Sequence, residues 1–263
     1  MSDEGDLWDS FFVDAGAAEP VLRNLAGLTD ARALQHFEYA ATAQRDYEIR
    51  SGAVAIAGQF DLAHVRAVHR HLFQDVYAWA GELRPVNISK EGKSFVPLEQ
   101  IEGWLNAARD VVTQNPPAQL DRAELVRLGA AYYALYNTAH PFREGNGRTG
   151  KALLHQLTES TDWAYDFNRV EKDLWDRASQ ESRPADPRLS GPDPSALVPV
   201  FDRITVERTG VDAEPETEQL RALHRTSYPR PPADVVREPD AQIEQREPSR
   251  PSRMYGRDYG RGD

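Results

Sequence analysis

The stretch "HPFREGNGRTGK", residues 140–151, lies between two segments with helical periodicity. The segment before it carries apolar residues at helical spacing up to Leu135, and the segment 151–158 after it repeats that pattern. Gly145 and Gly147 lack a Cβ atom and can adopt positive φ angles, so successive backbone N–H groups can turn toward one point. These donors and the positive end of the following helix suit an anion such as phosphate. The stretch therefore predicts a phosphate-binding turn between two helices.

Four side chains of the same stretch add the chemistry of group transfer. His140 needs only the ordinary pKa of a histidine to accept a proton from a hydroxyl near neutral pH. Glu144 places a carboxylate beside the turn, and Mg²⁺ is the ion that bridges a carboxylate and phosphate oxygens. Arg148 and Lys151 lie three residues apart on one side of the first helical turn, where both can reach outer phosphate oxygens. Each residue alone has an ordinary structural interpretation, but together they predict transfer from a nucleoside triphosphate.

Two other interpretations of nearby residues, a nucleotide-binding P-loop and a histidine metal site, do not fit the sequence. Residues 145–152 match the phosphate loop G-x-x-x-x-G-K-[ST] except at Ala152, where that loop needs a hydroxyl, and the preceding segment is helical rather than a strand. His64, His69 and His71 share one helix, but the last two point about 200° apart, so the three cannot hold one metal ion. We interpret these histidines as polar residues at the edge of the core.

Helical periodicity dominates the chain around this stretch. Helices are expected after Thr29, after Asp61, over residues 101–112, from Asp121 with Glu124 in a capping box, over residues 151–158, around Leu174, and around residues 197–204. One segment differs. "RPVNISKEGKSFVP", residues 84–97, has β-prone pieces at Val86–Ser89 and Ser94–Val96 around a turn with Gly92. The sequence thus predicts an all-α fold with one small hairpin, although an ordinary connector is the alternative for residues 84–97.

The composition narrows the classes of function. The 263 residues carry a net charge of −11, which argues against binding nucleic acid by neutralising its phosphates. There is no cysteine, which excludes disulfides and thiolate metal sites. No apolar run approaches the roughly 20 residues of a membrane span, and the acidic start lacks the features of a signal peptide. We expect a cytoplasmic protein without membrane or nucleic-acid partners.

The end of the chain has a different composition. Residues 209–263 are rich in Pro, Arg and Gly and show no apolar period. Such a segment buries too little apolar surface to offset the entropy lost on ordering. We expect a disordered C-terminal tail.

The stretch 140–151 resembles the signature of the Fic/Doc (Fido) family, H-P-F-x-[DE]-G-N-G-R-x-x-R. "LRNLAGLTDARALQHFEYA", "HRHLFQDVYAWAGELRPVNISKEGKSFVP" and "DWAYDFNRVEKDLWDRAS" also follow in the order of that family. The resemblance implies an N-terminal extension over 1–19, a Fic domain over 20–208 and the tail over 209–263. It further implies a helical core, a β-hairpin flap, and transfer of AMP from ATP to a Ser, Thr or Tyr hydroxyl of a target protein.

The resemblance also implies a role for each site residue. His140 would deprotonate the target hydroxyl, Phe142 would anchor the loop, and Glu144 would hold Mg²⁺ on the α- and β-phosphates. Asn146 and the backbone of Gly145 and Gly147 would grip those phosphates, and Arg148 the outer ones. The hairpin would act as a flap that pairs with an extended target segment through Val86, Asn87, Ile88, Ser89, Lys90, Lys93, Ser94 and Phe95.

Lys151 departs from the family signature, which ends on arginine. Lysine keeps the charge but loses the planar bidentate fork, so contact with the γ-phosphate is in question. The inhibitory motif [ST]-x-x-x-E-[GN] of self-restrained relatives is also absent, since none of the four Glu-Gly pairs has Ser or Thr four residues before the Glu. We therefore expect a bacterial toxin or effector restrained by a separate small antitoxin with an inhibitory helix; topoisomerase subunits are targets by analogy only.

Two alternative functions stay open at this stage. A transferase of the same fold could use another donor and transfer UMP, GMP, phosphate or phosphocholine, although glycine at 147 favours nucleotidyl transfer because the phosphorylating branch carries lysine there. A non-catalytic helical binding module with a vestigial loop is the other alternative. Export as an effector is also open.

Overall fold

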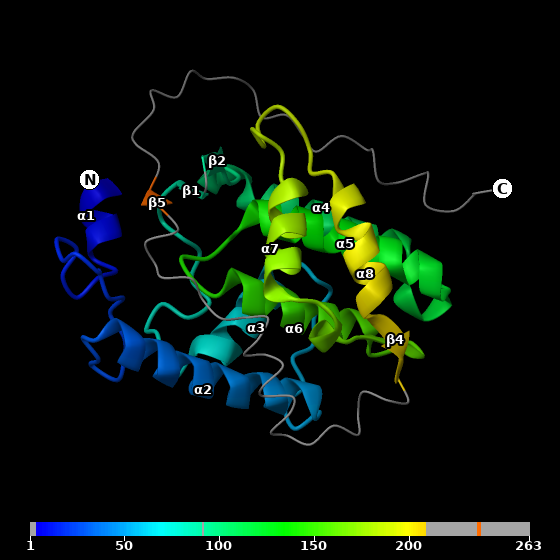
Figure 1. The fold of residues 1–263 in the computed structure, drawn as a ribbon, viewed down its shortest axis with the longest axis horizontal. Coiled ribbons are helices and arrows are strands. Elements are labelled where there is room, and N and C mark those ends of the chain that lie inside the picture. Colours follow the sequence, from blue (N-terminus) through cyan, green and yellow to red (C-terminus); the bar gives the residue numbers. More distant parts are fainter. Residues whose placement is uncertain (1–3, 91, 209–235, 238–263) are drawn as a thin grey trace.

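The computed structural model describes residues 4–90, 92–208 and 236–237, and their fold is helical (Figure 1). The α-helices are α1 (Glu4–Asp9), α2 (Ala31–Arg50), α3 (Leu62–Phe73), α4 (Ile101–Gln114), α5 (Arg122–Ala139), α6 (Asn146–Thr158), α7 (Lys172–Glu181) and α8 (Val198–Ile204). Single 3₁₀ turns lie at Leu98–Gln100, Pro117–Gln119, Phe167–Arg169 and Pro194–Ala196. The predicted all-α fold is confirmed. The division at residues 19 and 208 stays a prediction.

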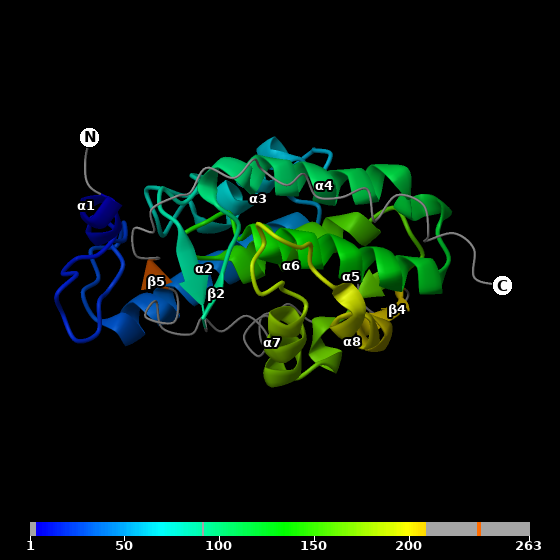
Figure 2. The ribbon, with the colours of Figure 1, turned by 90° about the horizontal axis from the view of Figure 1, so that it is seen from above.

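Helix α5 forms the centre of the core, and α4, α6 and α8 pack against it (Figure 2). It begins with the predicted capping box, in which Asp121 accepts from the backbone of Glu124 and the Glu124 side chain accepts from Asp121 N–H. The small residues Gly129, Ala130, Ala131 and Ala134 let its neighbours approach closely, and a Cβ atom at Gly129 would lie 2.4 Å from the Tyr165 hydroxyl. The middle of α5 is therefore packed closely in the protein interior.

Two helix starts differ from the sequence prediction. Helix α2 is capped by Asp30 rather than Thr29, because the Asp30 carboxylate accepts from Ala33 N–H at 2.8 Å. Helix α6 begins at Asn146, five residues before the predicted start at Lys151. Gly145 at φ 84° reverses the chain immediately before it, so the residues of the predicted loop form the first turns of the helix.

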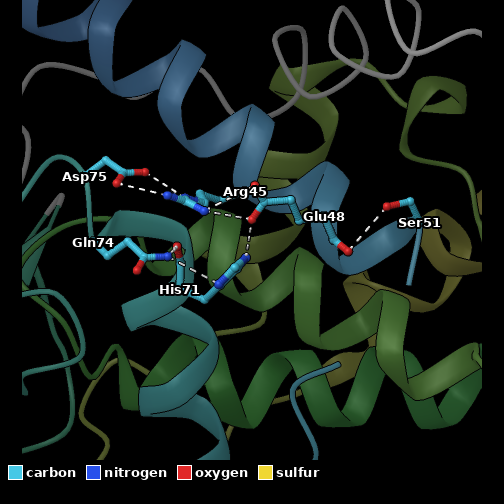
Figure 3. Close-up of polar contacts among 6 residues, drawn as sticks. All are labelled: Arg45, Glu48, Ser51, His71, Gln74 and Asp75. Atoms are coloured by element: carbon cyan, nitrogen blue, oxygen red, sulfur yellow. Dashed lines mark hydrogen bonds and ion pairs between the residues drawn. The ribbon is translucent and has the colours of Figure 1, made fainter. Parts of the chain in front are cut away.

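A polar cluster fastens α2 to α3 (Figure 3). Arg45 of α2 donates to Asp75 at 2.7 Å, just beyond the end of α3, and pairs with Glu48 at 3.0 Å within its own helix. His71 of α3 lies 3.1 Å from the same Glu48 carboxylate. The cluster fixes the register of α2 against α3, and both helices contribute residues to the site described below.

The strands form two small sheets. β1 (Ile88–Lys90) and β2 (Lys93–Ser94) form the predicted hairpin in the register Ser89 opposite Ser94. A third strand, β5 (Val236–Arg237), pairs with the other edge of β1. β3 (Trp163–Tyr165) pairs with β4 (Thr205–Glu207), which the sequence did not predict. The predicted disordered tail lies outside the described residues except for β5, which is a strand.

None of the helices in the described ranges combines the length and hydropathy that a bilayer crossing requires.

Candidate active site

His140 stands at the C-terminal end of α5 with its backbone in the left-handed region, at φ 42° and ψ 61°. Only a few residues other than glycine adopt this conformation, and it turns the chain sharply out of the helix. The imidazole stacks on Phe95, which follows β2, with the ring centroids 3.8 Å apart. The base predicted from the sequence therefore lies directly against the hairpin.

The surroundings of His140 keep its ring neutral. Burial, followed by the positive charges of Arg183, Lys90 and Arg84, lowers the pKa of His140 well below the ordinary value. The backbone carbonyl of Asn137 opposes this shift only in part. Because Nδ1 is buried, Nε2 is the nitrogen that remains for a proton from outside.

Arg84 ties the hairpin to the His140 turn, and the sequence analysis did not identify it. Its buried guanidinium donates to the carbonyl of His140 at 2.9 Å, to that of Val86 at 2.8 Å, and to that of Val96. Its backbone N–H also donates to Pro141 O at 2.9 Å. One side chain thus holds both ends of the hairpin and the backbone of the base.

The turn between α5 and α6 is closed by Asn146. Its side-chain oxygen accepts from Phe142 N–H at 3.0 Å, and its side-chain nitrogen donates to Phe142 O at 2.9 Å. Phe142 is fully buried, as expected of an anchor. The Asn146 side chain is therefore engaged in shaping the turn, and its predicted contact with phosphate stays a prediction.

His69 supports the same turn from α3. Its Nδ1 accepts from Gly81 N–H at 2.8 Å, so Nε2 carries the hydrogen and donates to the carbonyl of Glu144 at 3.0 Å. The ring is stacked on Phe142 at 3.7 Å and on Phe73 at 4.6 Å, and burial lowers its pKa to about 3. His69 is fully buried rather than at the edge of the core, where the sequence analysis placed it, and the sequence did not reveal that it holds Glu144.

Arg148 and Glu144 lie together, and a second carboxylate joins them. Glu38 of α2 is buried and accepts from Arg148 and from the Tyr77 hydroxyl. Glu144 is 3.6 Å from the same guanidinium and accepts from Gly145 N–H at 2.9 Å. Burial, followed by the charge of Glu38, raises the pKa of Glu144, whereas Arg148 opposes this shift.

The first turn of α6 is open on one side. Its first N–H groups have no carbonyl partner inside the helix, as at any helix start. A Cβ atom on Gly147 would meet no atom within 4 Å, whereas one on Gly145 would lie 2.2 Å from the Phe73 ring. The space beside Gly147 is where a phosphate could approach the backbone.

Lys151 does not join this cluster. It is buried, and its ammonium lies 5.2 Å from the Phe167 ring and 5.3 Å from the Trp175 ring. Burial lowers its pKa to about 7. The structure thus places Lys151 in the core beside α7, and its predicted contact with outer phosphates stays a prediction.

The hairpin residues divide by face. Val86, Ile88 and Phe95 are buried and pack against Leu7 and Trp8 from α1. The remaining predicted flap residues are half-buried: Asn87, Ser89, Lys90, Lys93 and Ser94. The polar main chain of β1 and β2 is thereby presented above an apolar base.

Comparison with known proteins agrees with the fold and the turn. A model of the Fic/DOC family matches residues 59–158. The chain is 37% identical over 153 residues to the probable protein adenylyltransferase y4lH of Sinorhizobium fredii, covering 57% of this chain and 77% of that one. It is 37% identical over 163 residues to the protein adenylyltransferase VbhT of Bartonella schoenbuchensis, covering 62% of this chain but only 34% of that longer protein.

A solved structure has the same fold at lower identity. BepC of Bartonella tribocorum, determined with bound AMPPNP, superposes with a TM-score of 0.66 at 20% identity, over 76% of this chain and 98% of that one. Fold and sequence together place the protein among helical enzymes built around a histidine-bearing turn. The chain belongs to the Fic/DOC family.

Proposed function

We propose that the protein transfers AMP from ATP to a Ser, Thr or Tyr hydroxyl of a target protein. The relatives above are named protein adenylyltransferases. The observation that carries the proposal is the turn from α5 to α6, where a neutral imidazole stands at one end and an open helix start with Arg148 at the other.

The proposed mechanism needs one proton acceptor and one anion cradle. Nε2 of His140 accepts the hydroxyl proton while the oxygen attacks the α-phosphorus, and the bond to pyrophosphate breaks. The low pKa of His140 keeps the imidazole neutral, and therefore ready to accept a proton, well into the acidic range. The N–H groups at the start of α6 and the Arg148 guanidinium would hold the phosphates, with Gly147 leaving the backbone accessible.

Mg²⁺ fits this donor set. The described residues contain no cluster of three or more metal-ligating side chains, and Mg²⁺ in nucleotide enzymes needs only one or two carboxylates besides phosphate oxygens. The raised pKa of Glu144 reflects the burial of a negative charge next to Glu38, which a cation would relieve. When bound, the ion would neutralise phosphate charge, and Glu144 would hold it.

The hairpin would receive the target. An extended segment of the target can pair its main chain with an edge strand of the hairpin. This pairing would hold a hydroxyl of the target near His140, whatever most of the target's other side chains are. The stacking of Phe95 on His140 and the three hydrogen bonds of Arg84 support this role, because they fix the hairpin against the base.

Labelling with α-³²P-ATP tests the proposal. His140→Ala should lose label on lysate proteins by 10²-fold or more, since a general base contributes about that much. His36→Ala is the matched control on an exposed histidine of α2 and should label normally. Normal labelling by His140→Ala, with its helical circular dichroism intact, would refute the assignment. Intact mass of the product separates AMP from UMP, GMP, phosphate and phosphocholine.

The finer biological role is also a proposal. We propose a bacterial toxin that acts in the cytoplasm, and the absence of the motif [ST]-x-x-x-E-[GN] supports its restraint by a separate antitoxin. Expression of the chain alone should arrest growth, and co-expression of a small protein encoded beside it should restore growth. Harmless expression of an enzyme that labels well in vitro would refute the toxin role.

A further inference from the structure

The edge of strand β1 that does not pair with β2 pairs with another segment of the same chain. Val236 lies opposite Ser89 and Arg237 opposite Ile88, antiparallel, so the sheet order is β2-β1-β5. Figures 1 and 2 both place β5 between the hairpin and α1. A segment about 150 residues beyond the hairpin in sequence therefore adds the third strand.

The other edge of the hairpin faces the body of the protein. Lys93 of β2 donates to Gln180 O at 3.0 Å and to Arg183 O at 3.1 Å, at the end of α7. Arg183 returns a hydrogen bond to Lys90 O at 3.3 Å. These contacts fasten the β2 side of the hairpin, so an incoming strand has the outer edge of β1 as its pairing surface.

The segment around β5 has no hydroxyl side chain that could accept AMP. Residues 229–248 contain no Ser, Thr or Tyr, whereas hydroxyls occur on either side at Tyr228 and Ser249. The sequence on either side of β5 contains prolines at 229, 231, 232, 239 and 248, and proline has no N–H group to donate to a partner strand. A short strand without an acceptor hydroxyl fills the edge and gives the enzyme nothing to modify.

We propose that the outer edge of β1 is a strand-docking surface whose resident occupant is Val236–Arg237, and that an extended target segment must displace it. The proposal rests on the proposed role of the hairpin in target binding. Because β5 belongs to the same chain, its pairing is intramolecular, and a separate target strand competes against its effective concentration. The edge then selects targets that pair more strongly than a two-residue strand.

Cross-linking of the full chain tests the pairing directly, because the natural sequence has no cysteine. Ser89→Cys with Val236→Cys joins directly opposite residues, whose Cα spacing in an antiparallel pair suits a disulfide. Ser89→Cys with Arg237→Cys is the matched control one residue out of register, where strand geometry turns the side chain to the other face. Under mild oxidation the first pair should cross-link at least tenfold faster. Equal rates would overturn the proposal.

A second experiment opens the edge. Val236→Pro with Arg237→Pro removes two strand N–H donors, and Glu244→Pro with Gln245→Pro repeats the change outside the paired residues. A fluorescein-labelled peptide of residues 229–248 should bind the first variant at least tenfold tighter than the wild type or the second variant, by anisotropy. Indistinguishable titrations for the three proteins would overturn the proposal.

The cross-linked protein separates this inference from the proposed activity. Oxidised Ser89→Cys/Val236→Cys protein should label lysate proteins at least tenfold less than its reduced form while binding a fluorescent ATP analogue equally. Equal labelling in both forms would refute displacement of the strand. Selective cross-linking without label in any form would instead refute the transferase activity, and the assignment of the edge would stand.

Discussion

At the scale of the residue, Arg84 affects both the position of His140 and its pKa. Its guanidinium donates to the carbonyls of His140, Val86 and Val96. These hydrogen bonds connect the two ends of the hairpin to the backbone of the base. The same positive charge contributes to the lowered pKa of His140. This buried cation therefore fixes the position of the base and, after burial and the charges of Arg183 and Lys90, helps to keep it neutral.

Arg84→Met should reduce labelling at least tenfold and shift its pH dependence. Loss of the positive charge raises the pKa of His140, so the imidazole becomes protonated earlier on acidification and the acid limb moves to higher pH. The measurement is the pH profile of initial labelling rates. Arg122→Met is the control, since Arg122 is the first residue of α5, at the end opposite His140, and pairs with Asp202. An unshifted acid limb would contradict the role of the charge.

Substitution by methionine should change the ATP affinity at Arg148 but not at Lys151. Lys151→Met removes a buried ammonium that lies beside two aromatic rings of the core. We expect an ATP affinity equal to that of the wild type. Arg148→Met should weaken ATP binding at least tenfold, because it removes the cation at the open turn. Equal losses of affinity, measured with a fluorescent ATP analogue, would contradict this expectation and support the predicted contact of Lys151 with phosphate.

At the scale of the element, the start of α6 depends on two glycines in different ways. Gly145 has φ 84° and would bring a Cβ atom to 2.2 Å from Phe73, whereas Gly147 has open space around it. Gly145→Ala should lower the free energy of unfolding by about 1–3 kcal/mol, as expected for strain of this kind. Gly147→Ala should leave stability nearly unchanged but reduce labelling, since its methyl group enters the proposed phosphate space. Urea unfolding and labelling of both variants measure the difference, and a stable Gly145→Ala protein would contradict it.

Local signals predicted the elements that depend on local sequence. The capping box at Asp121 and the glycine turn of the hairpin were both found because the residues that make them are neighbours in the chain. The sequence did not predict the early start of α6, because Gly-Asn-Gly is typical of a turn. Only the packing of Gly145 against Phe73 shows that the turn ends at Gly145 and that the helix begins at Asn146. The pair β3–β4 was missed because its strands are about 40 residues apart and pair only in the folded protein.

At the scale of the whole molecule, the site is assembled from four distant parts of the chain. The motif supplied His140, Glu144 and Arg148, and the structure brings these three to one turn. The residues that hold them were not predictable: Glu38 comes from α2, His69 from α3, and Arg84 from the segment before the hairpin. Each is an ordinary polar residue until tertiary packing gives it a partner.

The burial of several histidines makes the whole fold sensitive to acid. The pKa values of His64 and His140 are lowered, and those of His69 and His155 are lowered to about 3, mainly by burial. Above about pH 6.5 these rings are neutral in both the folded and unfolded states, so their burial carries no protonation penalty. As pH falls from about 6.5 toward 3, the unfolded chain takes up protons that the folded protein refuses, and stability is lost.

The free energy of unfolding should therefore fall steeply between pH 6.5 and 5, by up to about 1.4 kcal/mol per pH unit for each buried histidine. The raised pKa of Glu144 has the opposite effect on stability, but only in the pH range where this carboxyl takes up its proton. Urea unfolding at pH 7.5, 6.5 and 5.5 measures the slope. His155→Gln should make it shallower by about one histidine's share, whereas the same change at the exposed His36 should leave it unaltered. A slope insensitive to His155→Gln would mean that this ring takes up its proton without unfolding, through local opening of the end of α6 rather than of the whole protein.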